Sequence, residues 1–230
     1  MKIIQHGLAT IISITSIVIL LITSFEIGAY SDFGWYESAY EKYGVLDELE
    51  MEMQDVMHVT EEMMAYLRGN RADLVVDTVV DGQEREFFND REKAHMVDVK
   101  NLFIGGLWIR RIAVSLLVVS LFALIKTKAN WRRILPKSFL IGLGVFLGIT
   151  AGAGLLFMSD FNKYFLLFHE LFFSNDLWLL NPETDLLIRM LPEAFFLDMV
   201  RRIGIILLIL LLIGVMVSVI ILRKHKDKNN

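Results

Sequence analysis

The sequence of 230 residues contains no cysteine and only three prolines, and only 22% of its residues are charged. The absence of cysteine excludes disulfides, cysteine-ligated zinc, iron–sulfur clusters and thiol nucleophiles. The low charge, together with a hydrophobic content of 55%, excludes a disordered chain. The net charge of −4 argues against a nucleic-acid-binding protein, which would need a basic surface.

What the chain has instead is four long apolar runs, at residues 7–25, 103–125, 139–158 and 203–222. Each is long enough to cross a hydrocarbon core of roughly 30 Å, so we expect four membrane-spanning helices. Arg110 and Arg111 interrupt the second run, and charges in such a place usually face a bundle interior or a watery cavity. Glu26 and Asp198 are candidate partners for them, and snorkelling to the interface is the alternative.

The distribution of basic residues predicts the orientation in the membrane. The connector at 126–137 holds five basic residues and no acidic one, and the C-terminal tail is also basic (Arg223, Lys224, Lys226 and Lys228, against Asp227). By the positive-inside rule both lie in the cytoplasm, with both termini. We therefore expect a single integral membrane domain over 1–230, with outer loops at 31–101 and 159–202 that carry net charges of −11 and −3.

The first outer loop is patterned for regular structure. Apolar residues recur at three and four positions from Leu46 to Leu67, which predicts an amphipathic helix rich in methionine and capped by Gly69. The stretches 74–80 and 83–88, separated by Asp81-Gly82, predict a β-hairpin with a type I′ turn. The fold class we expect is therefore an all-α membrane bundle of four transmembrane helices with an extracytoplasmic α+β cap.

Two helix starts are indicated in the outer loops. Asn89 followed by Glu92 resembles a capping box, and the helix it opens can continue into the second apolar run. A helix over 90–126 would be roughly 55 Å long. In the second loop, aromatic residues over 161–172 predict a short helix at the membrane surface, Asn181-Pro182 predicts a helix start, and Pro192 is expected to open the last span.

Without cysteine, the candidates for acid–base chemistry at neutral pH are five histidines. His58 falls opposite the methionine stripe and is expected at the surface. His95 and His169 lie in different outer loops, each close to an apolar run, so they can face each other at the outer mouth of the bundle. The alternative is two separate interfacial side chains.

Charged neighbours surround both histidines in the sequence. Arg91 and Asp98 share a helix face with His95, and Asp98 is expected to fix its imidazole tautomer, whereas a structural salt bridge is the competing interpretation of Arg91. Asn175 and Asp176 follow His169. No motif for a zinc protease, a phosphate loop or a serine nucleophile occurs, so we predict no metal and no cofactor.

Two elements resemble a known family. The first is residues 88–100, Phe-Asn-Asp-Arg-Glu-Lys-Ala-His-Met-Val-Asp-Val-Lys; the second is Phe168-His169-Glu170, followed by residues 175–182 and Thr184-Asp185. Both are similar to elements of the lipoprotein intramolecular transacylases, called Lit. The four-span layout, the chain length and the large first outer loop also resemble that family, so the resemblance covers essentially the whole chain.

The resemblance implies a bacterial acyltransferase of the cytoplasmic membrane, with its active site at the outer face. It would move the sn-2 acyl chain of S-diacylglyceryl-cysteine to the α-amino group of the same lipoprotein cysteine, giving an N-acyl-S-monoacylglyceryl (lyso-form) lipoprotein. Its partners would be diacylated lipoproteins and membrane lipid, not nucleic acid. A non-catalytic membrane accessory protein that binds lipid or a partner is the alternative.

The resemblance also implies that His95 and His169 are the catalytic residues. As supporting or substrate-binding residues we predict a set of polar side chains in the same elements, with Arg91, Lys100 or Arg110 as oxyanion donors: Asp98, Arg91, Lys100, Arg110, Asn175 and Asp176. We expect the methionine-rich helix to cover the site or to contact lipid chains.

Overall fold

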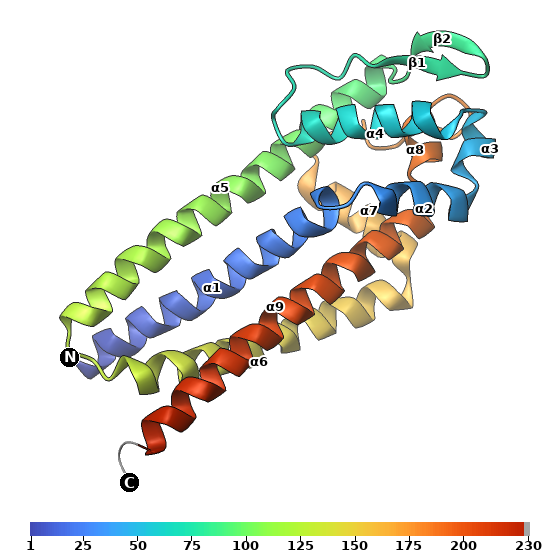
Figure 1. The fold of residues 1–230 in the computed structure, drawn as a ribbon. Helices are drawn as coiled ribbons and strands as arrows, with labels where there is room; N and C mark the ends of the chain where they lie inside the picture. Colours follow the sequence, from blue (N-terminus) through green and yellow to red (C-terminus); the bar gives the residue numbers. More distant parts are fainter. Residues whose placement is uncertain (228–230) are drawn as a thin grey trace. The chain divides into compact units, whose positions relative to one another are not determined.

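The structure, a computed structural model, describes residues 1–227, apart from the side chains of Phe157, Met158, Phe161 and Asp227. Lys228 of the basic tail therefore lies outside the described residues. The described chain is mainly helical, with one two-stranded sheet (Figure 1). Its elements are α1 (Lys2–Tyr30), α2 (Gly34–Tyr43), α3 (Val45–Leu49), α4 (Met53–Leu67), β1 (Asp77–Val80), β2 (Gln83–Glu86), α5 (Asp90–Lys126), α6 (Trp131–Ser159), α7 (Phe161–Phe172), α8 (Leu186–Met190) and α9 (Glu193–Asp227).

Within the described residues, four helices are long and apolar enough to cross a membrane. They are α1, α5, α6 and α9, and the four apolar runs of the sequence fall on them. The expected fold class, a four-helix membrane protein with a small α+β part, is confirmed. The apolar run of α5 begins at Phe103, so the N-terminal turns of this helix precede its membrane-spanning part.

The chain forms two compact units, which we describe separately. The membrane unit comprises residues 1–25, 107–165 and those from 204 onward, whereas the polar unit comprises 26–106 and 166–203. In the membrane unit α1 packs against α6, where Ser13 Oγ donates to the carbonyl of Ser138 at 3.0 Å. A Cβ on Gly142 would lie 2.3 Å from Ser13 Oγ, so this glycine permits the close approach of the two helices.

The polar unit has a hydrophobic core built around two tyrosines of α2. The hydroxyl groups of Tyr40 and Thr60 are 2.7 Å apart, and Tyr36 donates to the carbonyl of Ala29 at 2.9 Å. The methionine stripe of α4 is buried in this same core. Their spacing places these methionines on the face of α4 that packs inside the unit, whereas the expectation that the helix covers the site or contacts lipid chains stays a prediction.

The predicted amphipathic helix is divided into α3 and α4. Glu50, between them, has a φ of 54°, a left-handed conformation that a continuous helix cannot contain. At the other end the prediction is confirmed, because Gly69 has a φ of +83° and the amide of Asn70 donates to the carbonyl of Ala65 at 2.9 Å. This is the Schellman pattern that a glycine cap favours.

The predicted hairpin is confirmed, with shorter strands than expected. β1 and β2 are antiparallel with Val80 opposite Gln83. Asp81 and Gly82 both have positive φ values, 53° and 69°, as the type I′ turn requires.

The predicted capping box is also confirmed, and it reaches further than the sequence indicated. The amide of Asn89 donates to Glu92 Oε2 at 2.7 Å, and the amide of Glu92 donates to Asn89 Oδ1 at 3.0 Å. The other carboxylate oxygen of Glu92 accepts from the amide of Leu187, in α8, at 2.6 Å. Glu92 is fully buried, and burial raises its pKa although the backbone hydrogen bonds oppose this shift. One side chain thus joins the two outer loops.

The predicted helix start at Asn181-Pro182 is wrong. These residues form a turn in which the amides of Thr184 and Asp185 both donate to the carbonyl of Asn181, at 3.0 and 2.8 Å. The helix begins later, at Leu186. The carboxylate of Asp185 accepts hydrogen bonds from the amide of Asn181 and from Asn89 Nδ2, each at 2.7 Å. Its oxygens therefore stabilise the turn and the junction with α5.

Replacing Glu92 by glutamine should destabilise the protein by about 1–3 kcal/mol, because an amide keeps one acceptor oxygen where two backbone amides need one each. Thermal unfolding in detergent measures this. Asp90→Asn is the matched control, since it removes the same charge from the same helical turn at a fully exposed position. Equal melting temperatures for the two variants would contradict the role given to Glu92.

Candidate functional site

The structure brings His95 and His169 together within the polar unit. His95 lies on α5 and His169 on α7, and the centroids of their rings are 6.3 Å apart with an angle of 37° between the planes. Each is only 8% exposed. Among the described side chains of α7, only His169 is buried, whereas Tyr164 and Phe165 are half-buried and the others are exposed. Two loops that are far apart in sequence, 31–101 and 159–202, therefore converge on one pair of imidazoles.

Aromatic rings enclose this pair. The ring of Phe173 lies 5.4 Å from that of His95 and 5.5 Å from that of His169. The ring of Trp178 lies 4.9 Å from that of His169 at 30°, and Phe168 meets the same imidazole edge-on at 5.4 Å. The pair is thus held in an apolar environment that keeps most water away.

That environment sets the charge of His95. Its Nδ1 is buried and has no hydrogen-bond partner among the described residues. Burial, the largest cause, lowers the pKa of His95 to about 4 together with the neighbouring His169 and Arg91, while Asp98 opposes the shift. His95 is therefore neutral at pH 7, which leaves an imidazole able to accept a proton.

Two side chains on either side of His95 hold the segment that follows α7. Asn175 Nδ2 donates to Asp98 Oδ2 at 2.8 Å. Arg91 donates to the carbonyl of Asp176, and its guanidinium lies 3.7 Å from Asp176 Oδ1. The carbonyl of Asn175 in turn accepts from Trp178 Nε1 at 2.9 Å, which fixes the indole that packs on His169.

These contacts bear on two expectations. Asp98 accepts a hydrogen bond from Asn175, and among the described residues no bond joins it to His95, so its control of the His95 tautomer stays a prediction. For Arg91, the competing interpretation is confirmed, because it forms a salt bridge with Asp176. Arg91, Asp98, Asn175 and Asp176 are all close to the histidine pair, but they act on the segment that packs against it.

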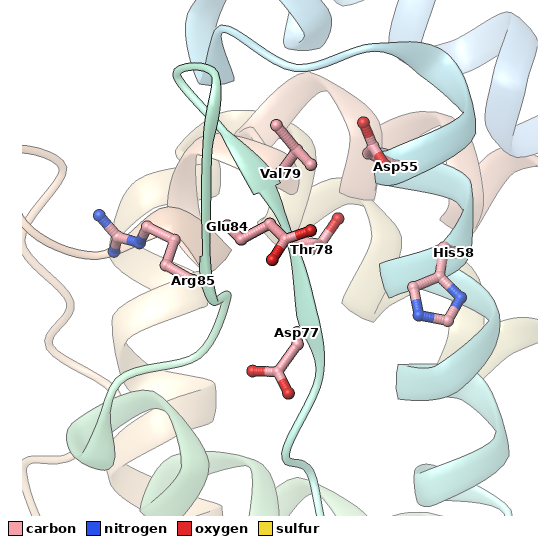
Figure 2. Close-up of a pocket in the computed structure, with 7 residues that line it drawn as sticks. All are labelled: Asp55, His58, Asp77, Thr78, Val79, Glu84 and Arg85. Carbon is pink, nitrogen blue, oxygen red and sulfur yellow. The ribbon is translucent and has the colours of Figure 1, made fainter.

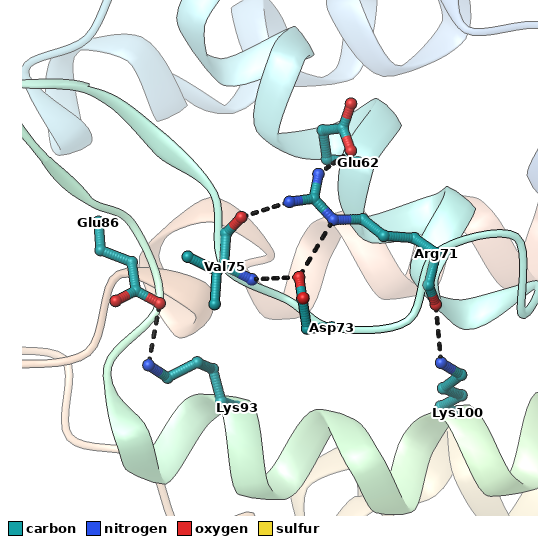
Figure 3. A network of polar contacts seen from close by, with 7 residues as sticks. All are labelled: Glu62, Arg71, Asp73, Val75, Glu86, Lys93 and Lys100. Carbon is teal, nitrogen blue, oxygen red and sulfur yellow. Dashed lines mark hydrogen bonds and ion pairs between the residues drawn. The ribbon is translucent and has the colours of Figure 1, made fainter.

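Lys100 is directed elsewhere. Its Nζ donates to the carbonyl of Arg71 at 3.0 Å and lies 3.9 Å from the centroid of the Tyr66 ring. Figure 3 shows it in a network that ties α5 to the segment after α4, where Arg71 also contacts Glu62 and Asp73. These contacts give Lys100 a structural role in the polar unit, and its role as an oxyanion donor stays a prediction.

The arginines of the second span lie in the membrane unit. Arg111 stacks on Trp108 at 4.9 Å, and Arg110 lies beside it in the same helix. Asp198, in the polar unit, contacts Lys42, Tyr43 and Arg201. Glu26 accepts from Arg68 at 3.4 Å.

The remaining histidines lie apart from the pair. His58 is exposed on α4, as expected. His6 Nδ1 lies 2.8 Å from the carbonyl of Lys2, and His225 Nε2 lies 3.2 Å from Asn130 Nδ2. Within residues 1–227, no group of three or more His, Asp or Glu side chains is arranged to hold a metal ion.

The relatives of the chain identify its family. The family profile "Lipoprotein intramolecular transacylase Lit" matches residues 10–196. The chain belongs to the Lit family. The expectation of an enzyme is confirmed at the level of that family, and four apolar helices make this Lit protein a multi-pass membrane protein.

Solved structures share the fold. The in meso structure of the membrane integral lipoprotein intramolecular transacylase Lit from Bacillus cereus superposes with a TM-score of 0.81 at 20% identity, covering 99% of this chain and 100% of that chain. Variants of the same Bacillus cereus protein, with a histidine replaced by alanine or by arginine, superpose with TM-scores of 0.78 and 0.77, both at 20% identity. The first covers 97% of this chain and 96% of its own, the second 97% and 94%. No individual curated protein matches the sequence.

Three residues of this Lit site were not among the predicted site residues. Phe173 and Trp178 pack on the imidazoles, and Glu92, known from the sequence only as a cap, lies on the same helix face as His95, one turn earlier. The available signal was spacing, since Phe173 is one helical turn after His169. Trp178 follows a break in the helix, so only the tertiary structure shows where its ring lies.

The buried position of His95 predicts its titration. We expect a pKa near 4 in histidine-labelled protein followed by NMR, assigned with the His95→Asn variant. His169→Ala should raise this pKa, because it removes a neighbouring positive charge and admits water.

The same shift predicts how stability depends on pH. The pKa of His95 in the folded state, about 4, lies below the value of about 6.5 for an unfolded chain, so its contribution is fully present above 6.5 and is lost as the pH falls towards 4. A midpoint at or above 6.5 in the NMR titration would contradict both expectations.

Proposed function

We propose that this Lit protein moves the sn-2 acyl chain of an S-diacylglyceryl-cysteine to the α-amino group of the same cysteine, giving a lyso-form lipoprotein. The observation that carries the proposal is the pair of buried imidazoles, 6.3 Å apart, from two separate loops. An accessory protein that only binds lipid has no need for such a pair. Membership of the Lit family supports the same reaction.

The transfer needs no outside reagent. The amine nitrogen forms a bond with the ester carbonyl carbon, the bond from that carbon to the sn-2 glyceryl oxygen breaks, and one proton passes from the nitrogen to that oxygen. Donor and acceptor belong to one molecule, so holding them in contact can contribute roughly 7–11 kcal/mol. What the protein must supply is orientation and a route for the proton.

The two histidines supply that route in our proposal. His95 is the base, since it is neutral at pH 7 and its buried Nδ1 has no partner among the described residues. Its imidazolium form is disfavoured by burial and by His169, so the proton does not remain there. His169 delivers a proton to the departing glyceryl oxygen, and the pair regains its starting charge.

The surroundings of the pair suit a lipid-bearing substrate. α7 presents Leu167, Leu171 and Phe172 outward with exposures of 51%, 77% and 51%, which offers an apolar surface to acyl chains. In this proposal the site faces the outer leaflet and both termini lie in the cytoplasm, as the basic connector at 126–137 predicts. Arg91 and Asp98 are positioning residues in this proposal.

Replacing either histidine tests the proposal directly. We expect His95→Ala and His169→Ala each to lower lyso-form production by about 10²–10⁴-fold, the usual value of acid–base catalysis. Mass spectrometry of a lipoprotein N-terminus from expressing cells measures the product. His6→Ala, which removes an exposed histidine of α1, is the control and should keep full activity. Normal activity in either of the two variants, at normal protein level, would refute the assignment.

The assignment of His95 as base also predicts the pH profile. The apparent kcat/KM for a synthetic diacylglyceryl-cysteine peptide should rise with pH and level off near 7.7–8.0, where the substrate amine loses its proton. Protonation of His95 lowers kcat/KM further only near pH 4. The sign follows because a protonated His95 cannot accept the amine proton. A kcat/KM profile with a limb near pH 6.5 that belongs to His95, and not to the substrate amine, would contradict this role.

A further inference from the structure

The histidine pair is closed to a substrate in this structure. His95 and His169 are each 8% exposed, and the rings of Phe173 and Trp178 lie against them. An acyl transfer assisted by these imidazoles brings the reacting amine and ester within hydrogen-bond reach of them. An exposure this small leaves no room for both groups and their acyl chains. Part of the cover must therefore move before a substrate binds.

The part of the cover that can move is the segment of residues 174–179, which we call the covering segment. It carries Trp178, the ring that packs on His169. Its side chains are exposed or half-buried, whereas Phe173, before it, is buried and Leu180, after it, packs against the hydrophobic core. Buried contacts give a segment its local stability, so the covering segment is less stable than either of its ends.

Two polar contacts with α5 hold the covering segment in place. Asn175 Nδ2 donates to Asp98 Oδ2 at 2.8 Å, and Arg91 donates to the carbonyl of Asp176. Both contacts lie at the surface, because Asn175 is exposed and the side chains of Arg91 and Asp176 are 40% and 77% exposed. Exposed contacts add little stability, since water replaces them when they break. They can therefore hold the segment and also release it.

Hydrogen bonds inside the covering segment connect these contacts to the indole. The carbonyl of Asn175 accepts from Trp178 Nε1 at 2.9 Å, and Asn175 Oδ1 accepts from the amide of Leu177 at 3.1 Å. Asn175 thus joins α5 on one side to the ring on His169 on the other. When its bond with Asp98 breaks, Trp178 can leave the imidazole together with the turn that carries it.

We infer that the covering segment is a gate, which opens to admit the lipid-bearing end of the substrate to the histidine pair and closes again during the transfer. The inference rests on the proposed function, because only a reaction at the imidazoles requires them to be reached. Exposed apolar side chains suit such an entrance, since Leu171 and Phe172 directly precede the segment and Leu179 lies on it. Closure keeps out water, which would compete with the amine for the ester.

A reversible cross-link tests the gate, and the absence of cysteine from the sequence makes the labelling specific. The double variant Asp98→Cys, Asn175→Cys, treated with a short bifunctional methanethiosulfonate, holds the covering segment to α5 until a reductant cleaves the link. The matched control is Val79→Cys, Glu84→Cys, which links opposite positions of β1 and β2, shown in Figure 2. No residue of this hairpin packs on the two imidazoles in the described structure.

The first readout needs no enzyme activity. Diethyl pyrocarbonate carbethoxylates the imidazoles that it can reach, and peptide mass spectrometry measures the modification of His169 in the full chain in detergent. We expect the cross-link to slow this modification about tenfold or more, and reductant to restore it. The exposed His6 should react at the same rate throughout. An equal rate at His169 with and without the cross-link would overturn the gate.

Weakening a contact with α5 should act in the opposite direction. Arg91→Met removes the donor to the carbonyl of Asp176, so the segment should open more often and His169 should react about threefold faster or more. Lys93→Met is the matched control, since it makes the same charge change on the same helix, where Lys93 pairs with Glu86. Faster modification in both variants, or in neither, would contradict the inference.

Activity on a diacylated lipopeptide in detergent is the second readout. Production of the lyso-form should fall about 100-fold or more in the cross-linked variant and return when reductant cleaves the link, whereas the control cross-link should leave it unchanged. Normal activity with the link intact would overturn the gate, because the substrate then reaches the histidines by another route. Slower modification of His169 by the cross-link, in a protein without transacylase activity, would instead refute the proposed function and leave the gate standing.

Discussion

The carboxylate of Glu92 is the interaction on which the rest of the polar unit depends. It is fully buried, and it accepts hydrogen bonds from the amides of Asn89 and Leu187. These amides belong to the loops 31–101 and 159–202, which are separated in sequence by most of α5 and by α6. A buried carboxylate is stable only when its oxygens are paired, so both loops must be in place for either to fold this way. The start of α5, which bears His95 one turn later, is fixed by the same requirement.

Burial has a chemical consequence at the histidine pair. Phe173 and Trp178 exclude water from the imidazoles, and that exclusion disfavours a positive charge on His95. A catalyst that takes a proton from an amine near neutral pH needs a neutral base, and an apolar environment also keeps water from competing with the amine for the ester. The aromatic residues therefore serve the proposed chemistry although they exchange no proton.

Local patterns in the sequence predicted local structure well. The Asp81-Gly82 turn, the capping box at Asn89, the Gly69 cap and the four long apolar runs were all recognisable, because each depends on neighbours within a few residues. The sequence did not show where a side chain contacts a distant segment. Asp98 bonds to Asn175 and not to His95, Lys100 is drawn to Arg71, and the methionines of α4 are buried in a core that the helix alone does not reveal.

The sequence by itself determined that this chain spans a membrane four times, that its polar loops carry two histidines with chemical potential, and which family it resembles. Only the tertiary structure decided that the two imidazoles lie 6.3 Å apart, and that the covering segment, residues 174–179, places an indole against one of them. The physical reason is the distance along the chain over which each effect acts. Hydrophobicity and capping act along the chain, whereas convergence of α5 with α7 depends on buried contacts between residues far apart in sequence, and no local pattern encodes their distance.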